Sequence, residues 1–418
     1  MDKLIGAAVV GQSGGPTAAI NATLAGVING ALSEQYGNGS ITKLYGMRNG
    51  IEGFLKRDLI DLSAEFSVRN DIDRDKLSDL SHTPAAGLGS CRKKLPDPEK
   101  DPEFFEELLS IFREYNIRYF FYIGGNDSMD TVAKLTKYLK NHDYEMRVVG
   151  LPKTIDNDLA GTDHTPGYGS AAKYIAATIQ EIIRDCAVYK IPAVTIVEIM
   201  GRDAGWLTAA AGLPRIISGN APDLIYLPEK NFNMDEFLAD VRAELEKKPN
   251  VVVAVSEGIR FADGTYVGEG AQSGSVDVFG HKYLAGTGKA LEMEVKNSIG
   301  CKVRSVELNI CQRCASHIAS QTDLDESSSV GCAGVEAAVS GVTGCMMSIV
   351  RTDSENYAVT YETSEISGVA NLIKKVPSEF INERGNNVTD ECLQYIKPLI
   401  IGEPNIRFEN GLPYHVVL

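Results

Sequence analysis

The sequence predicts an α/β protein with mostly parallel sheets, because one pattern of residues recurs along the chain. Each copy has a short β-branched or aromatic run and a polar turn rich in glycine, and most copies continue with helical spacing of apolar residues. Strands that alternate with helices form βαβ units, whose parallel strands are covered on both faces. At 418 residues the chain is long enough for two such domains.

Five copies of this pattern can be delimited. The strands are expected at 4–10, 117–123, 147–151, 192–199 and 250–256. The polar turns after them are 11–17, 124–128, 152–169, 200–205 and 257–264. Helical patterns follow the first four turns at 18–32, 129–139, 170–183 and 206–213. Because ligands bind outside the carboxyl ends of parallel strands, these turns are the predicted binding site.

Composition and charge exclude several classes of function. A formal net charge of −15 argues against nucleic acid as a partner, because phosphate backbones are bound by basic faces. The apolar stretch near the amino terminus, about seven residues, is too short for a signal or membrane-spanning segment. We therefore expect a cytoplasmic protein with no membrane partner. Its eight cysteines are expected to be reduced thiols, buried as small apolar side chains.

Domain limits are less clear than strands, because no linker or run of charge divides the chain. Two domains would then share a broad interface, and the chain could cross between them more than once. Three other segments have a predicted character: 84–102 is a basic loop, 261–280 is a glycine-rich surface loop or lid, and the tail from Ile381 contains a packed helix.

The first turn, GQSGGPT, follows a strand and opens a helix. Its glycines would let backbone N–H groups and the helix N-terminus face an anion. The turn matches neither the G-x-G-x-x-G pattern nor the Walker P-loop, so neither dinucleotide nor Walker-type binding is indicated. A tight connection without a ligand is the alternative.

The second turn, GGNDS, offers hard oxygens on Asn126 and Asp127. Such oxygens suit a magnesium ion that also contacts phosphate. The alternative is helix capping by Asp127 or Ser128. Capping and ligand binding are compatible.

The third turn is crowded with charge, since Lys153, Thr154, Asp156 and Asp158 lie within six residues. Two carboxylates this close do not both tolerate a phosphate unless one is a base and a metal is present. Phosphoryl transfer to an alcohol uses a carboxylate base, a metal on the phosphates and a cation over the transferring group. Lys153 supplies the cation. The alternative is an Asx turn with solvated charges.

The last two turns add Arg202 in MGRDAG and Glu257 in SEGIR. A guanidinium suits a phosphate oxygen, and a carboxylate suits sugar hydroxyls. Each alone would be no better than a solvated surface residue, so the prediction rests on the five turns together.

The segment CQRCASH places Cys311, Cys314 and His317 at a spacing that resembles half of a zinc site. A structural zinc site needs four ligands, and the sequence has no second C-x-x-C or H-x-x-x-H to complete it. We therefore do not expect zinc. Arg313, between the cysteines, is the more interesting residue.

With these motifs together, the chain resembles the phosphofructokinases. The motifs that carry the resemblance, in the family's order and spacing, are GGNDSMDT, PKTIDND, MGRDAGW, SEGIR and QRCASHIAS. The likeness runs from Gly11 to about Gly344, and the ending NERGNNVTDECLQYIKPLI looks like longer bacterial members of the pyrophosphate-dependent branch.

The resemblance implies two Rossmann-like α/β domains with the active site in the cleft between them. It implies a phosphoryl-donor domain at 1–167 plus 312–365, and a sugar-phosphate domain at 168–311 plus 366–418. It also implies fructose 6-phosphate as acceptor, Mg²⁺ as cofactor, and a step of glycolysis or gluconeogenesis.

Roles carried over by motif make Asp156 the base, with Lys153 and Arg202 as further catalytic residues. Pyrophosphate contacts are expected at Gly14, Arg92, Asp127 and Lys153, and metal contacts at Asn126 and Asp127. Substrate contacts are expected at Thr154, Ile155, Asp156, Asp158, Met200, Gly201, Arg202, Glu257, Arg304 and Arg313.

Asp127 and Lys153 decide the expected donor, because ATP-using members look to have glycine at both positions. A carboxylate would fill and repel the space of a nucleotide's α-phosphate, and an ammonium would stabilise a pyrophosphate leaving group. Both point to pyrophosphate as donor. An ATP-dependent enzyme and a non-catalytic regulatory subunit are the alternatives.

The sequence departs from the family's pattern at Asn126, where many members have aspartate, at Asn309–Ile310 and at Ala193. The last two departures remove expected contacts to the sugar 6-phosphate, which leaves sedoheptulose 7-phosphate open as an acceptor. In relatives, residues such as Arg304 and Arg313 cross a subunit interface, so a homodimer or homotetramer is expected.

Overall fold

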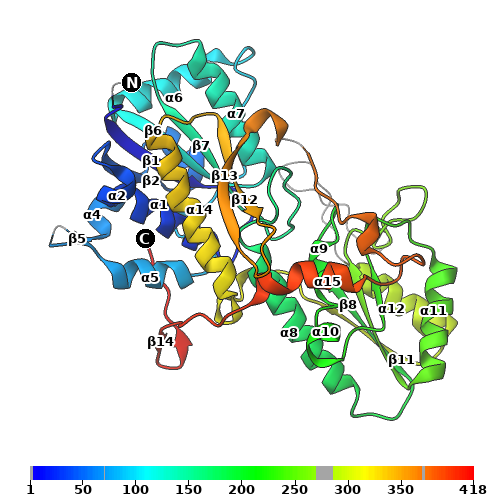
Figure 1. Ribbon diagram of the computed structural model, residues 1–418. Coiled ribbons are helices and arrows are strands. Elements are labelled where there is room, and N and C mark those ends of the chain that lie inside the picture. The colour runs from blue at the N-terminus through cyan, green and yellow to red at the C-terminus, as the bar shows by residue number, and fades with distance from the viewer. Residues whose placement is uncertain (1–2, 70, 270–285, 370–371) are drawn as a thin grey trace.

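The computed structural model describes residues 3–69, 71–269, 286–369 and 372–418. Two main sheets organise these residues, each with helices on both faces (Figure 1). The larger, seven-stranded sheet has the order β13 (Val359–Glu365), β12 (Cys345–Arg351), β7 (Arg147–Pro152), β6 (Ile117–Gly124), β1 (Gly6–Gln12), β2 (Ile41–Met47) and β3 (Leu59–Asp61). Its pairs are parallel except at the two edges, where β13 and β3 run antiparallel to their neighbours.

The inner strand β1, GAAVVGQ, is buried along its whole length, because helices cover both faces of the sheet. Successive strand side chains point to opposite faces. Ala8 and Val10 pack in one core with α1 (Ile20–Leu32), α5 (Arg74–His82) and α14 (Gln321–Val339). Ala7 and Val9 pack in another core with α3 (Gly50–Leu55), α6 (Pro102–Glu114) and α7 (Asn126–Lys140).

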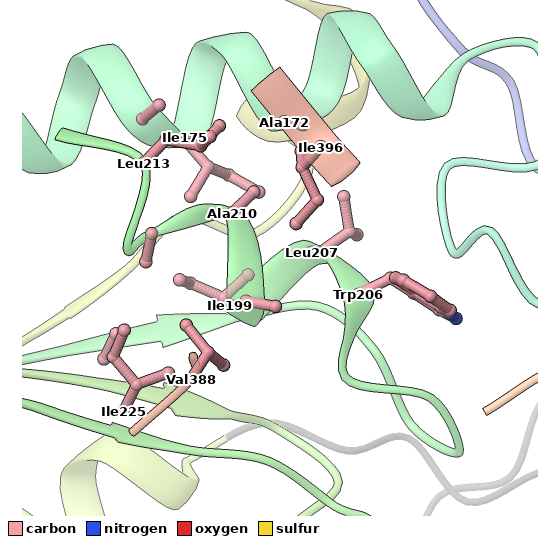
Figure 2. Packing of buried hydrophobic residues seen from close by; sticks show 14 of the residues in the cluster. Ala172, Ile175, Ile199, Trp206, Leu207, Ala210, Leu213, Ile225, Val388 and Ile396 are labelled. Carbon is pink, nitrogen blue, oxygen red and sulfur yellow. The ribbon is translucent and has the colours of Figure 1, made fainter. Parts of the chain in front are cut away.

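The second sheet is four-stranded and wholly parallel, in the order β11 (Lys302–Glu307), β8 (Ala193–Ile199), β10 (Asn250–Ser256) and β9 (Leu224–Tyr226). One face is covered by α8 (Tyr168–Cys186), α9 (Trp206–Ala210) and α15 (Asp390–Ile396). The other is covered by α11 (Met234–Lys247) and α12 (Thr287–Ser298). Figure 2 shows Leu207 and Ala210 of α9 between α8 and the strand that carries Ile199.

Shorter elements complete the described residues. They are α2 (Glu34–Gly37), α4 (Leu62–Glu65), β4 (Ser67–Val68), β5 (Asp71–Ile72), α10 (Pro214–Ser218), α13 (Cys311–Cys314), β14 (Phe408–Glu409), β15 (Leu412–Pro413) and the 3₁₀ turns η2 (Ser316–Ile318), η3 (Ile366–Gly368), η4 (Ser378–Phe380) and η5 (Lys397–Ile400). No helix among the described residues is long and apolar enough to cross a membrane.

The predicted α/β class with two Rossmann-like units is confirmed, and all five predicted strands are present. They belong to two sheets: β1, β6 and β7 to the larger, and β8 and β10 to the smaller. The repeating pattern alone does not reveal this division, because each βαβ unit looks the same whichever sheet its strands join, whereas the domain limits implied by the resemblance separate the first three strands from the last two. The predicted helix in the tail is α15, whose Cys392, Leu393 and Ile396 are buried.

The predicted basic loop at 84–102 is confirmed up to residue 101, since only Cys91 makes an isolated bridge there before α6 begins. The long loop expected at 261–280 lies within the described residues only as far as 269. From 261 to 269 the chain makes turns against its own backbone, with Phe261 N donating to Thr265 O at 2.9 Å.

The last residues of the chain return to the larger sheet, and Figure 1 shows the C-terminus near α1 and α5. Val416 is buried in the core of α1 and β1, and its N–H donates to Thr83 Oγ1 at 2.9 Å. Residues 366–418 therefore contact both halves of the molecule. The domain limits given above stay a proposal.

Candidate active site

A cavity of about 500 Å³ opens between the two sheets, where turns from both meet. The larger sheet contributes the turns after β1, β6 and β7, and the smaller sheet those after β8 and β10. The lining residues are Ser13, Gly14, Gly15, Pro16, Thr17, Arg92, Lys94, Gly125, Asn126, Asp127, Ser128, Lys153, Thr154, Ile155, Asp156, Asp158, Met200, Arg202, Asp203, Ala204, Glu257, Arg313 and Ile373.

The turn after β1 brings its backbone close to Lys153. Gly14 has a φ of +78°, a left-handed conformation that glycine adopts without strain. A Cβ at this position would lie 3.4 Å from Lys153 Nζ. The same ammonium donates a hydrogen bond to Gly15 O at 2.6 Å. The glycines therefore bring the backbone of this turn close to the lysine.

The turn after β6 places Asp127 in the first turn of α7. The N-cap residue of that helix is Gly125, which has no side chain, so the alternative of capping by Asp127 or Ser128 is wrong. Asp127 Oδ1 instead forms an ion pair with Lys94 Nζ at 2.9 Å. Lys94 belongs to the basic loop before α6, so that loop forms part of the cavity wall.

The turn after β7 is held by its own hydrogen bonds. Thr154 Oγ1 accepts from Asp156 N at 3.1 Å and donates to Asp156 Oδ2 at 3.4 Å. Asn157 has a φ of +53°, and its Oδ1 accepts from Thr165 N at 3.1 Å. The local turn is therefore made by Thr154, whereas the alternative is an Asx turn with solvated charges, and Asp156 and Asp158 are partly buried. Asp156 and Asp158 nevertheless line the cavity, so a local turn and a functional site coexist.

Lys153 is only 3% exposed. Burial lowers the pKa of its ammonium to about 8, partly offset by the negative charges of Asp156 and Asp158, while Arg92 and Arg313 lower it further. A buried ammonium with two guanidinium groups nearby would be stabilised by an anion in the cavity.

The two aspartates are also shifted by burial. Burial raises the pKa of Asp156, against the hydrogen bond from Thr154 and the charge of Lys153. Burial and the neighbouring Asp156 raise the pKa of Asp158 to about 7. A carboxylate with a raised pKa is a stronger base, as a proton acceptor near neutral pH should be.

The turn after β8 approaches Glu257 through its backbone. Gly201 has a φ of +133°, and a Cβ there would lie 2.6 Å from Ala204 O, so only glycine fits. Gly201 N donates to Glu257 Oε1 at 3.3 Å. Burial raises the pKa of Glu257 to about 8, and the charge of Asp156 adds to the shift.

The helix α13 contacts the same turn and carries Arg313 to the cavity. Gln312 is buried, and its Oε1 accepts from Met200 N at 3.2 Å. The Arg313 Nη1 atom would be 3.5 Å from a Cβ added at Gly15. Arg313 thus lies where the turns of the two sheets meet.

All eight cysteines are free thiols. Cys91, Cys345 and Cys392 are buried, as expected for small apolar side chains. The expectation of burial is wrong for Cys311 and Cys314, which are exposed on α13. The four-residue helix turns its middle residues, and not its cysteines, toward the protein.

The oxygens near Asp127 fit a metal that arrives with phosphate. Asn126 Oδ1 is buried and has no hydrogen-bond partner among the described residues, while Asp127 offers a carboxylate in the same wall. In the described part of the chain, no group of three or more His, Cys, Asp or Glu side chains could hold a metal alone. A divalent ion held by one or two protein oxygens and by phosphate needs no such group.

The structure brings nearly all predicted site residues together. Gly201 does not line the cavity, but its N–H holds Glu257. Arg304 is exposed on the edge strand β11 and lines a different cavity of about 20 Å³.

Sequence reasoning missed Lys94, Asp203 and Ile373 as lining residues. Lys94 lies in the predicted basic loop, two residues after Arg92, and Asp203 lies within the motif MGRDAG, so a signal for both was available. Ile373 lies far along the chain in a segment without regular structure, and no pattern in the sequence indicates it.

Comparison with known proteins agrees with this geometry. A family model described as phosphofructokinase matches residues 7–338. The pyrophosphate–fructose 6-phosphate 1-phosphotransferase of Halomonas elongata is 41% identical over 404 residues, covering 96% of this chain and 93% of that protein. The protein of the same name from Methylococcus capsulatus is 40% identical over 410 residues, covering 97% and 94%.

A solved structure gives the same result at the level of fold. The crystal structure of pyrophosphate-dependent phosphofructokinase from Nitrosospira multiformis has a TM-score of 0.87 and 37% sequence identity to this chain, covering 99% of this chain and 96% of that one. The fold, the cavity and these matches agree over almost the whole length, and the chain belongs to the phosphofructokinase family.

Proposed function

We propose that the protein transfers a phosphoryl group from pyrophosphate to the 1-hydroxyl of fructose 6-phosphate, giving fructose 1,6-bisphosphate and phosphate, reversibly. The observation that carries the proposal is that Lys153 and Asp127 line the same cavity as Asp156. Asp127 would repel the α-phosphate of a nucleotide, and Lys153 suits the charge that develops on a phosphate leaving group. The names of the matched relatives support this donor.

In the proposed reaction, Asp156 accepts the proton of the sugar 1-hydroxyl, and Thr154 orients its carboxylate through the hydrogen bonds described above. The hydroxyl oxygen forms a bond to the transferred phosphorus while the bond to the bridging oxygen of pyrophosphate breaks. The departing phosphate keeps the electron pair, and Lys153 stabilises its charge. Asp158 supports the turn beside Asp156.

Mg²⁺ would be held by Asp127 and the amide oxygen of Asn126, together with pyrophosphate oxygens. When bound, the ion neutralises charge on the donor. Gly14 and Arg92 would contact the same pyrophosphate, and Lys94, which lines the cavity and forms an ion pair with Asp127, would share this role.

On the acceptor side, Ile155, Met200, Gly201 and Arg202 would form the sugar-phosphate pocket, and Glu257 would accept hydrogen bonds from sugar hydroxyls. Arg304 faces away from this cavity into another one, so its role requires a neighbouring subunit. We therefore propose a homodimer or homotetramer, in which Arg304 acts across the interface.

The test supplies purified protein with fructose 6-phosphate and either pyrophosphate or ATP, in parallel and with Mg²⁺. We expect turnover with pyrophosphate and none with ATP, and product formation in the reverse direction from fructose 1,6-bisphosphate and phosphate. Turnover with ATP alone would end the proposal for the donor. Activity that requires a second, different chain would favour a regulatory subunit.

The acceptor is tested in the same assay by replacing fructose 6-phosphate with sedoheptulose 7-phosphate. We expect a higher kcat/KM with fructose 6-phosphate. A higher kcat/KM with sedoheptulose 7-phosphate would contradict fructose 6-phosphate as the preferred acceptor. Size-exclusion chromatography with light scattering tests the oligomer, and an active monomer would contradict it.

A further inference from the structure

A segment late in the chain runs along the back of the charged turn. Ile373 makes an isolated antiparallel bridge with Leu159, and Lys374 N donates to Asp158 O at 2.8 Å. Ile373 lines the cavity, while the side chain of Lys374 points behind the turn and is partly buried. The segment therefore contacts the turn of Asp156 through both backbone and side chain.

The ammonium of Lys374 holds the loop from Asn157 to Asp163. Its Nζ donates to Asn157 Oδ1 at 3.3 Å, to Thr162 O at 3.3 Å, and to Asp163 O. These acceptors lie on both arms of the loop. One cation thus links Asn157, next to Asp156, to Thr162 and Asp163, which lie in the segment before α8.

The middle of the turn needs such support. Asn157 lies between two carboxylates and has a left-handed φ of +53°. Its Oδ1 already accepts from Thr165 N, so the single oxygen joins Thr165 and Lys374. Because Asp156 and Asp158 repel each other, a positive charge behind the turn favours the conformation in which both are held close together.

The same lysine also links the turn to the smaller sheet. Trp206 Nε1 donates to Lys374 O at 3.0 Å, and the ammonium lies 5.3 Å from the centroid of the indole ring. Trp206 begins α9, four residues after Arg202, and lies at the end of the core shown in Figure 2. Lys374 therefore contacts the turn that carries Asp156 and the first residue of the helix that follows the turn of Arg202.

We infer that Lys374 is a positioning residue for phosphoryl transfer: it holds Asn157, and through it the Asp156 carboxylate, in register with the loop of Arg202. It touches neither substrate. The inference rests on the proposed function, because it assigns Asp156 the role of base. A displacement of about 1 Å at a reacting group costs on the order of 10²-fold in rate.

The test compares Lys374→Met, which keeps the length of the side chain but not its charge, with Lys375→Met as matched control, since Lys375 is exposed next to it. We expect Lys374→Met to lower kcat by about 10²-fold while both KM values change by less than about threefold. The control should match the parent protein. A purely structural role would lower the amount of folded protein instead and leave the kcat of the folded fraction unchanged.

A double-mutant cycle checks the route through Asn157. Asn157→Gly tolerates the positive φ but removes the amide oxygen. If the lysine acts through this oxygen, Lys374→Met should add less than about threefold to the loss of kcat caused by Asn157→Gly. Fully multiplicative losses would overturn the proposed route.

Hydrogen–deuterium exchange gives a readout that needs no turnover. In Lys374→Met we expect faster exchange of the amides of 156–165, with unchanged exchange in β1 and β6. Unchanged exchange at 156–165 together with unchanged kcat would overturn the inference. If the parent protein shows no turnover with pyrophosphate, the proposed function fails, and exchange in the same variants still decides whether Lys374 holds the turn.

Discussion

Both sheets contribute charges of both signs to one cavity, but burial shifts the pKa of a lysine on one side and of a glutamate on the other. The donor side, made of the turns after β1, β6 and β7 and the loop of Arg92 and Lys94, contains the buried ammonium of Lys153 among charges of both signs. The acceptor side, made of the turns after β8 and β10, offers Glu257, whose carboxylate burial tends to neutralise. In both cases burial moves a pKa to about 8, downward for Lys153 and upward for Glu257.

This difference teaches how one cavity can distinguish two phosphorylated ligands. Buried cations destabilise the folded protein while no anion is bound, and they are stabilised when a highly charged anion binds. A protonated or partly protonated carboxyl group repels a sugar phosphate less and still forms hydrogen bonds to hydroxyls. Asp156 lies on the donor side but interacts with two groups of the acceptor side. The charge of Arg202 lowers the pKa of Asp156, and the charge of Asp156 raises the pKa of Glu257.

The largest effect is expected at Asp156, which interacts with both sides of the cavity. Asp156→Asn keeps the shape of the side chain but removes the proton acceptor, so kcat should fall by about 10⁴-fold. The dissociation constant of fructose 6-phosphate, measured by calorimetry, should change by less than about threefold, because a neutral amide still accepts hydrogen bonds. Weaker sugar binding with normal turnover at saturation would refute the base assignment.

A smaller effect is expected on the donor side. Lys153→Met removes the buried cation, and kcat with pyrophosphate should fall by about 10²- to 10³-fold, the range found when one transition-state donor is lost. The KM for fructose 6-phosphate should stay nearly constant if the two sides act separately. Lys93→Met is the control, since Lys93 lies over the Phe104 ring outside the cavity lining. An equal loss in the control would show a nonspecific effect of charge.

The acceptor side should respond less and in a different parameter. Glu257→Gln removes a charge-assisted hydrogen bond, worth about 1.5 kcal/mol, and so raises the KM for fructose 6-phosphate about tenfold. The KM for pyrophosphate should not change. Steady-state kinetics with each substrate varied in turn decides this. A rise in the KM for pyrophosphate instead would break the division of the cavity into two sides.

The fold and most of the site could be predicted because their signals are local. The run RVVGLP and the turn after it show the strand β7 and the charged residues at its end within a dozen positions. The alternative of helix capping by Asp127 is wrong because the N-cap residue of α7 is Gly125, which makes no side-chain cap. Lys374 lies more than 200 residues from Asp158 in the sequence. Its role depends on tertiary contacts that no periodic pattern in the sequence indicates.

The smallest expected effect is the movement of protons on binding, and it should differ in sign between the two sides. Pyrophosphate near Lys153 raises the pKa of the ammonium above about 8, so at pH 8 binding should take up as much as about half a proton. Sugar hydroxyls that donate to Glu257 favour its ionised form and lower its pKa from about 8, so fructose 6-phosphate binding should release protons at the same pH.

Calorimetry in two buffers of different ionisation enthalpy measures both proton numbers directly. Pyrophosphate itself titrates near this pH. The contribution of Lys153 is therefore the difference in proton number between the parent protein and Lys153→Met. The contribution of Glu257 is the corresponding difference for Glu257→Gln. Since Lys153 and Glu257 lie on different sides of the cavity, each variant should change only the proton number of its own ligand. If either variant abolished both changes, the two groups would titrate as one coupled unit, and the cavity would have to be treated as a single electrostatic site.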